Sequence, residues 1–249
     1  MNNIYYHSSN RMPELSDESI HLVVTSPPYP MIEKWDDSLA GWTNEYQDKG
    51  PFWKWYMQHE TLYASWQECY RVLIDGGIMC VNIGDATRSM DGQFRCYPNY
   101  AKLMMDCVNL GMTPLIPIFW KKISNRPNAF LGSGMLPTSG YVSQDCEYIA
   151  ILRKGLPRKF KPKDETRYAS AFTKEERDLW FQQIWCINGK TGAGKTSSFP
   201  REIPYRLIRM FSVLGDTVLD PFGGTMVTGD VAEELGRNFI GYEVNPDAT

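Results

Sequence analysis

The sequence predicts an α/β fold, with a mostly parallel sheet covered by helices on both faces. Apolar runs of strand length alternate along the chain with longer segments of helical periodicity, which is the pattern of such a sheet. The chain has 249 residues, enough for one large domain or two small ones, and it contains no internal repeat. A hydrophobic content of 43% and a charged content of 22% are ordinary for a soluble globular protein.

The predicted elements follow from two periodicities. Short apolar runs predict strands at residues 4–6, 20–24, 78–83, 115–120, 146–152, 218–220 and 239–244. Apolar residues at three- and four-residue spacing predict helices at 12–15, 52–73, 97–110, 204–213 and 227–235. Glycines follow three of these helices, at Gly76, Gly111 and Gly236, where helices commonly end.

The composition argues against several other classes of protein. No apolar run approaches the about 20 residues of a membrane-spanning helix, and the first residues show no secretory signal. The six cysteines are scattered, which predicts reduced side chains in the cytoplasm and neither a disulfide framework nor a metal site. A net charge of −3 argues against a uniformly basic nucleic-acid-binding protein but allows a local basic face.

A rigid loop follows the predicted strand 20–24. It consists of Thr25, Ser26, Pro27, Pro28, Tyr29 and Pro30. Consecutive prolines fix two φ angles and keep the preceding residue extended, and their carbonyl groups remain free to accept hydrogen bonds. A hydroxyl group, free acceptors and an aromatic face together suit a planar group that carries an amine. A Pro-rich surface turn without function explains the same residues equally well.

A glycine-rich turn follows the predicted strand 218–220 and precedes a helix without proline. It consists of Asp220, Pro221, Phe222, Gly223, Gly224 and Thr225. Glu243 lies near the end of the next strand, and a carboxylate at that point of a β-α-β unit suits ribose hydroxyl groups. The turn therefore predicts a nucleoside cofactor, with a purely structural turn as the alternative.

Residues 189–196 match the P-loop pattern G-x-x-x-x-G-K-[ST]. A P-loop needs a helix that starts at the Lys-Thr end of the pattern. Pro200 and Pro204 follow closely, and a helix that runs through Pro200 would lose about 3 kcal/mol. We therefore interpret the segment as a flexible loop with basic residues, and keep a P-loop nucleotidase as an alternative.

The two loops resemble the motifs of DNA amino-methyltransferases. Residues 25–29 resemble the catalytic (D/N/S)-P-P-(Y/F) motif of that family, and residues 220–225 resemble the start of its cofactor motif, D-P-F-x-G-x-G-T. Further segments that match are 70–73, 76–77, 82–85, 120–122, 147–149, 153–154, 199–200, 207–208 and 215–219. The catalytic motif precedes the cofactor motif, which is the order of the β group. The resemblance spans nearly the whole chain.

The resemblance implies a Rossmann-like class I methyltransferase fold in one domain, residues 1–249, with a target-recognition region inserted at about 125–195. It implies S-adenosylmethionine as cofactor, and no metal. The cofactor contacts that it implies are Thr25, Ser198, Phe199, Asp220, Phe222, Gly224, Thr225 and Glu243. Two departures from the family pattern are Met226-Val227, where Gly-Thr is usual, and Ser8-Ser9, where an acidic residue often follows the first strand.

The catalytic residues that the resemblance implies are Ser26, Pro27, Pro28 and Tyr29. Tyr29 would stack on a base that is flipped out of the duplex, while the Ser26 side chain and the Pro27 carbonyl accept the two amine hydrogens. Serine at position 26 resembles the N4-cytosine enzymes more than the N6-adenine enzymes, which remain the alternative. Asp85 is either an orienting carboxylate or a helix cap.

A basic stretch without acidic residues is the implied contact for DNA phosphates, with a solvated loop as the alternative. Its members are Arg153, Lys154, Arg158, Lys159, Lys161 and Lys163. The implied partner is double-stranded DNA, in a prokaryotic or phage-like cytoplasm. A cognate restriction endonuclease acting on the same site, without a stable complex, and a homodimer are both compatible with this interpretation. A catalytically silent nucleic-acid-binding module is a third hypothesis.

Overall fold

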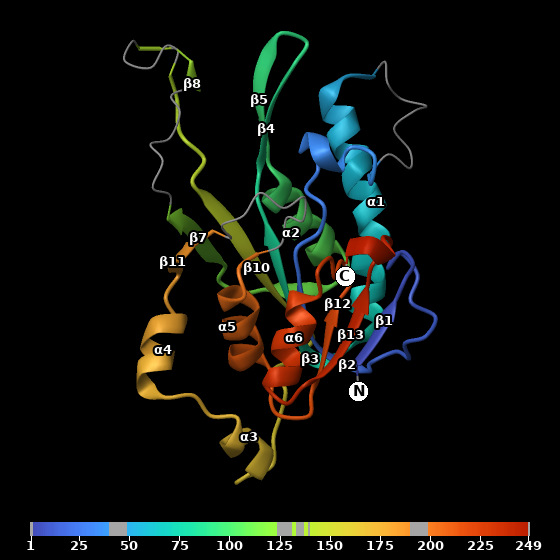
Figure 1. Cartoon of the computed structure of the whole chain (residues 1–249), viewed down its shortest axis with the longest axis vertical. Helices are drawn as coiled ribbons and strands as arrows, with labels where there is room; N and C mark the ends of the chain where they lie inside the picture. The colour runs from blue at the N-terminus through green and yellow to red at the C-terminus, as the bar shows by residue number, and fades with distance from the viewer. Residues whose placement is uncertain are drawn as a thin grey trace.

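The computed structural model describes residues 2–39, 49–123, 131–132, 137–138, 140–189 and 199–248. Its centre is a nine-stranded sheet with helices on both faces (Figure 1). The strands are β1 (Asn2–Tyr5), β2 (Ile20–Thr25), β3 (Leu73–Ile83), β6 (Met112–Pro114), β7 (Ile118–Ile123), β10 (Cys146–Lys154), β11 (Ile184–Asn188), β12 (Thr217–Asp220) and β13 (Asn238–Tyr242). Their order is β1-β13-β12-β2-β3-β10-β7-β11, with β6 beside β10. Among the described strands of this sheet, only the pairs that involve β10 are antiparallel, so the predicted mostly parallel sheet is confirmed.

The parallel strands end at one edge of the sheet, which we call the carboxyl edge and which faces the top of Figure 1. Strand β10 starts at this edge and runs to the opposite one, the amino edge. Its register shows the reversal, because Tyr148 pairs with Ile83 at the end of β3, whereas Arg153 pairs with Ile78. The two ends of β10 are therefore on opposite sides of the molecule.

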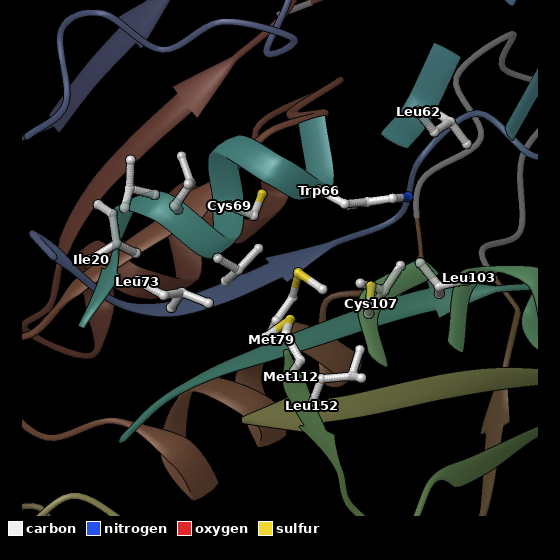
Figure 2. Close-up of a cluster of buried hydrophobic side chains, with 14 of the residues drawn as sticks. Ile20, Leu62, Trp66, Cys69, Leu73, Met79, Leu103, Cys107, Met112 and Leu152 are labelled. Atoms are coloured by element: carbon white, nitrogen blue, oxygen red, sulfur yellow. The ribbon is translucent and has the colours of Figure 1, made fainter. Parts of the chain in front are cut away.

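Helices cover the sheet on both faces. These helices are α1 (Pro51–Val72), α2 (Asn99–Asn109), α5 (Glu202–Phe211) and α6 (Val227–Glu234). Two shorter helices, α3 (Glu165–Ala169) and α4 (Lys174–Trp180), lie away from the two faces (Figure 1). Side chains of α1 and α2 pack with Val23, Met79 and Val81 on one face, in the cluster of Figure 2. Side chains of α5 and α6 pack on the other face, with Leu22 and Val24. The alternation of buried residues along β2 thus places one core on each face.

The predicted helix at 12–15 is wrong. Met12 and Leu15 are buried, but the segment makes a single turn in which the N–H of Leu15 donates to the carbonyl of Met12 at 3.2 Å. The guanidinium of Arg71 donates to the carbonyl of Leu15 and to the carbonyl of Met12, at 2.9 Å each. The segment therefore satisfies its backbone through α1 and does not need a helix.

The region predicted as an insertion, 125–195, contributes β10 and β11 to the central sheet itself. In the sequence, the short helices α3 and α4 come between these two strands. Small hairpins extend beyond the sheet, β4 (Ala86–Met90) with β5 (Gln93–Tyr97) and β8 (Leu131–Gly132) with β9 (Gly140–Tyr141). In the described ranges, no helix is both long and apolar enough to cross a bilayer, and no three His, Cys, Asp or Glu side chains group as a metal site requires.

A buried carboxylate joins the ends of β2 and β12. Asp220 Oδ1 accepts a hydrogen bond of 2.6 Å from the hydroxyl of Thr25, and Asp220 Oδ2 accepts one of 2.7 Å from the hydroxyl of Thr228 in α6. The backbone N–H of Phe222 also donates to Oδ1, at 3.1 Å. Asp220 is 3% exposed. Burial raises the pKa of Asp220 to about 6, and the three donors oppose this rise.

This pKa predicts a specific pH dependence of stability. The Asp220 carboxyl group holds its proton more tightly in the folded chain than at its ordinary pKa of 3.8, so its contribution to stability is complete below about pH 4 and is lost as the pH rises through about 6. The variant Asp220→Asn keeps the shape of the side chain and removes this titration. We expect the difference in unfolding free energy, wild type minus variant, to fall by roughly 2.5 kcal/mol between pH 4 and pH 7.

Urea denaturation at several pH values measures this difference. Asp230→Asn, at an exposed position of α6, is the matched control for the change of residue type. A difference between wild type and Asp220→Asn that stays constant from pH 4 to pH 7 would contradict the assignment of a buried, protonatable carboxyl group.

Candidate active site

One asparagine fixes the loops that follow β2 and β3 relative to each other. Asn99, the first residue of α2, is fully buried. Its Nδ2 donates to the carbonyl of Pro30 at 2.9 Å and to the carbonyl of Gly84 at 3.0 Å. Its Oδ1 accepts from Trp55 Nε1 at 2.8 Å and lies 3.1 Å from His59 Nε2. Burial lowers the pKa of His59 to about 3, so its ring is neutral and takes part in packing.

The loop after β2 ends in a strained residue. Met31 has a φ of +66°, in the left-handed region that residues other than glycine rarely adopt. Its N–H donates to Gln58 Oε1 at 2.8 Å, and Gln58 Nε2 donates to Asp36 Oδ1 at 3.1 Å. Asp36 in turn pairs with Lys54 and Arg88, both at 2.8 Å. A chain of polar contacts from α1 therefore holds the loop in its strained shape.

Ser26 and Tyr29 belong to a hydrogen-bonded network at the carboxyl edge. The Tyr29 hydroxyl donates to Glu147 Oε2 at 2.8 Å, accepts from Asn82 Nδ2 at 2.7 Å and lies 3.2 Å from Ser26 Oγ. Asn82 Nδ2 also donates to Glu147 Oε2, at 2.7 Å, and Lys122 forms an ion pair with Glu147 Oε1. Neighbouring strands β3, β10 and β7 supply Asn82, Glu147 and Lys122, so the sheet determines the position of the network.

The network assigns a direction to the hydroxyl of Ser26. Burial and the adjacent Glu147 carboxylate raise the pKa of Tyr29 well above its ordinary value, so the phenol keeps its proton. That single proton is donated to Glu147, and the contact between Ser26 and Tyr29 therefore requires the hydroxyl of Ser26 as donor. Among the residues that the structure describes, no other hydrogen bond to Ser26 Oγ is formed, so both of its lone pairs can accept hydrogen bonds from an amine.

The turn after β3 supports this network and starts α2. A Cβ atom on Gly84 would lie 3.2 Å from Glu147 Cγ and 3.3 Å from Tyr29 Cε2, so glycine leaves room for both side chains. Asp85 Oδ1 accepts from the N–H of Tyr100, in the first turn of α2, at 3.0 Å. Burial raises the pKa of the Asp85 carboxyl. Of the two roles predicted for Asp85, this geometry supports the helix cap.

The glycine-rich turn after β12 lies beside Glu243, which directly follows β13. The N–H of Gly224 donates to Glu243 Oε2 at 2.8 Å, and the N–H of Asn245 donates to Oε1 at 2.8 Å. Each carboxylate oxygen keeps a lone pair, and the side chain is half-buried, so Glu243 can accept two further hydrogen bonds. Two free acceptor positions suit the two hydroxyl groups of a ribose, so Glu243 is compatible with the predicted nucleoside site.

Met226 takes the backbone shape that glycine usually supplies. Its φ of +56° is left-handed, and its side chain is 7% exposed. A Cβ on Gly223 would lie 2.5 Å from Met226 Sδ, so the thioether packs directly beneath the turn. The departure from the family pattern at this position therefore preserves the tight turn, at a cost of about 1 kcal/mol or more in backbone strain.

The remaining predicted cofactor residues differ in exposure. Phe222 is half-buried and meets the Trp66 ring edge-on, with 5.7 Å between the ring centroids. Gly224 and Thr225 are also half-buried.

The hydroxyl of Thr25 and the carboxylate of Asp220 form a hydrogen bond with each other, so a direct cofactor contact from these two residues would have to come from their backbone. Phe199 is 5% exposed and packs in the core beneath α5. Ser198 and residues 190–196 of the P-loop-like segment lie outside the described residues.

The structure does not bring the basic stretch to the loop after β2. Arg153 pairs with Ile78 near the amino edge, whereas Thr25 pairs with Val81 near the carboxyl edge. The prediction for Lys154 needs correction, because its Nζ donates to the carbonyl of Leu73 at 2.7 Å and its side chain is only 13% exposed. The Lys154 ammonium group donates to a main-chain carbonyl and is therefore not free for an external phosphate.

Sequence reasoning gave no role to four residues of the site: Asn82, Asn99, Lys122 and Glu147. Asn82 and Glu147 lie in segments that resemble the family, but the resemblance does not say that they meet. Their contact depends on the antiparallel pairing of β3 with β10. A polar residue within each of these apolar strand patterns is the only signal that the sequence carries.

Comparisons with known proteins agree with this geometry. A family model described as a DNA methylase, of the N6/N4 methyltransferase type, matches residues 20–249. The Type II methyltransferase M.MjaI of Methanocaldococcus jannaschii is 53% identical over 97% of this chain and 86% of its own length. M.MthZI of Methanothermobacter thermautotrophicus is 42% identical over 97% of this chain and 72% of its own length.

Solved structures show the same fold. A candidate DNA modification methylase from Thermus thermophilus, in complex with S-adenosyl-L-methionine, has a TM-score of 0.79 and 30% identity, and the match covers all of this chain and 91% of that one. The cytosine-N4-specific PvuII DNA methyltransferase has a TM-score of 0.71 and 21% identity, over 99% and 83% of the two chains, and shares the fold. The chain therefore belongs to the N6/N4 DNA methylase family, the DNA amino-methyltransferases.

Proposed function

We propose that the protein transfers a methyl group from S-adenosylmethionine to the N4 amine of a flipped-out cytosine in duplex DNA. The observation that carries this proposal is the hydroxyl of Ser26 beside the anchored Tyr29, because no donor from the described part of the chain occupies its lone pairs. Membership of the family supports DNA as the substrate and S-adenosylmethionine as the methyl donor. The N6 amine of adenine is the second candidate, because the family methylates both amines.

The cofactor supplies an electrophilic methyl group when it is bound. Glu243 would accept the ribose hydroxyls, and the turn at Gly224 lets the backbone approach closely. Phe222, held against Trp66, would form an apolar wall of the same pocket. Thr25 and Asp220 act on this pocket indirectly, because they tie the turn to the end of β2.

Ser26 and Pro27 would accept the two hydrogens of the target amine. The lone pair of an exocyclic amine is delocalised into the ring, so hydrogen-bond acceptors that draw the amine out of plane make the nitrogen a better nucleophile. Tyr29 would stack on the extruded base while its hydroxyl stays bound in the network. Glu147 is then a positioning residue, because its contact with Tyr29 keeps the lone pairs of Ser26 pointed away from the protein.

The partner of the enzyme is duplex DNA. The Type II names of M.MjaI and M.MthZI support a restriction endonuclease that acts on the same DNA site. A homodimer and DNA contacts by residues of the segment 125–195 stay predictions.

The identity of the methylated nucleoside tests the proposal. DNA incubated with the protein and isotopically labelled S-adenosylmethionine is digested to nucleosides and analysed by mass spectrometry. We expect labelled N4-methylcytosine, and we expect Ser26→Ala to abolish transfer while S-adenosylmethionine binding, measured by calorimetry, stays largely unchanged. Labelled N6-methyladenine would select the second candidate. Loss of activity in Lys195→Ala but not in Ser26→Ala would contradict both and favour the P-loop.

The role of Glu147 predicts that two variants share one effect. Tyr29→Phe keeps the aromatic ring and removes the hydroxyl, whereas Glu147→Gln keeps the shape and removes the charge. Hydrogen bonds to charged groups contribute about 1.5–3 kcal/mol, so we expect each variant to lower kcat by roughly 10- to 100-fold. Because both changes act on the same bond, the double variant should lose little more than either single variant.

Three further measurements separate this role from a structural one. The Kd for S-adenosylmethionine, the KM for DNA and the urea midpoint should all change little. Glu165→Gln, at an exposed position of α3, is the matched control and should leave kcat unchanged. Effects of Tyr29→Phe and Glu147→Gln that simply add would show that the two side chains act independently.

A further inference from the structure

A cleft of about 820 Å³ lies at the amino edge, on the far side of the sheet from Ser26. We call it the basal cleft. It runs between the segment that follows β10 and the end of α5, and α3 lies beside it at the bottom of Figure 1. Six cationic side chains line it: Arg153, Arg158, Lys161, Lys163, Arg167 and Arg209. Neither the residues of the catalytic network nor those predicted cofactor residues that the structure describes line this cleft.

Positive charge dominates the basal cleft. Asp164 is the only carboxylate on its described lining, and it is engaged as the N-cap of α3, where it accepts from the N–H of Arg167 at 2.9 Å. The whole chain carries a net charge of −3, so six cations against one carboxylate is a marked local reversal. Like charges gathered in one cleft repel one another unless an anion joins them.

Most of these cations have no internal counter-charge. Arg158 pairs with Asp216 at 2.6 Å and Arg209 pairs with Glu176 at 3.1 Å. The other four, Arg153, Lys161, Lys163 and Arg167, form no ion pair with any carboxylate among the residues that the structure describes. Their charges are available to a ligand from outside the protein.

Two guanidinium groups are held in position before any ligand arrives. The ring of Phe160 lies 4.7 Å from the guanidinium of Arg158 and 5.1 Å from that of Arg167. Buried Arg209 Nε has no hydrogen-bond partner in the described part of the chain. A planar, fixed guanidinium is the side chain best suited to phosphate oxygens, because it donates two hydrogen bonds in parallel.

We propose that the basal cleft is a phosphate-binding site, separate from the site of methyl transfer. Its volume is that of a pocket for a ligand of nucleotide size. The phosphate comes either from a free nucleotide or from the backbone of DNA. This cleft is distinct from the loop after β2, because the distance from Ile78 to Ile83 along β3 already places the two edges roughly 17 Å apart.

Binding to three probes tests the proposal: inorganic triphosphate, ATP and a short DNA duplex that is not a substrate for methylation. Saturating S-adenosylhomocysteine is present throughout, so that the adenosine of ATP cannot report on the cofactor pocket. The variant Lys161→Glu/Arg167→Glu reverses two exposed charges of the cleft. Lys174→Glu/Arg177→Glu, on α4, reverses two exposed charges outside the cleft and is the matched control.

We expect at least one probe to bind the wild type and the control pair alike, and to bind the cleft variant roughly tenfold or more weakly, with a flatter salt dependence. Binding of triphosphate and ATP identifies a free-phosphate ligand, and binding of the duplex alone identifies the DNA backbone. Failure of all three probes to bind, or equal weakening by the two variants, would overturn the proposal. These binding outcomes do not depend on whether the protein methylates cytosine or adenine.

Discussion

The contact between Thr25 and Asp220 is the constraint on which the site depends. It joins the end of β2 to the end of β12, two strands that are neighbours in the sheet but far apart in the sequence. Burial of the carboxyl group is unfavourable, as its raised pKa shows, and the hydroxyl of Thr228 and the N–H of Phe222 offset part of that cost. In return the loop after β2 and the turn after β12 have one fixed separation, which the proposed displacement reaction between two bound molecules requires.

The loop after β2 is rigid for reasons beyond its two prolines. Asn99 binds the carbonyl that ends the loop, and Gln58 binds the N–H of the strained Met31. The side chains of Ser26 and Tyr29 are fixed by the sheet instead, because Glu147 in β10 accepts a hydrogen bond from Tyr29, and the Tyr29 hydroxyl bonds to Ser26. Helices α1 and α2 therefore set the backbone of the loop, while the sheet sets its hydroxyl groups. This division explains how a surface loop can hold a hydroxyl in one orientation.

Local patterns predicted most of the elements, because strand and helix periodicities depend only on neighbouring residues. Ser26, Asp220 and Glu243 were singled out in the same way, since each lies at or near the end of a predicted strand. Asn99 and Glu147 could not be found, because their partners lie in other strands and loops. The direction of β10 mattered most. A strand that ran parallel to β3 would have carried Arg153 to the carboxyl edge, whereas the antiparallel strand brings Glu147 there and takes Arg153 away.

The reversal of β10 also separates two kinds of electrostatic environment. At the start of the strand, Glu147 forms an ion pair with Lys122 and accepts hydrogen bonds from neutral donors. At its end, Arg153 joins a cleft in which positive charge is mostly unbalanced. In the proposed reaction the amine nitrogen gains positive charge as it is methylated, which a strongly positive field beside Ser26 would disfavour. Because the antiparallel strand carries Arg153 to the opposite edge of the sheet, the unbalanced positive charge of the basal cleft lies away from Ser26.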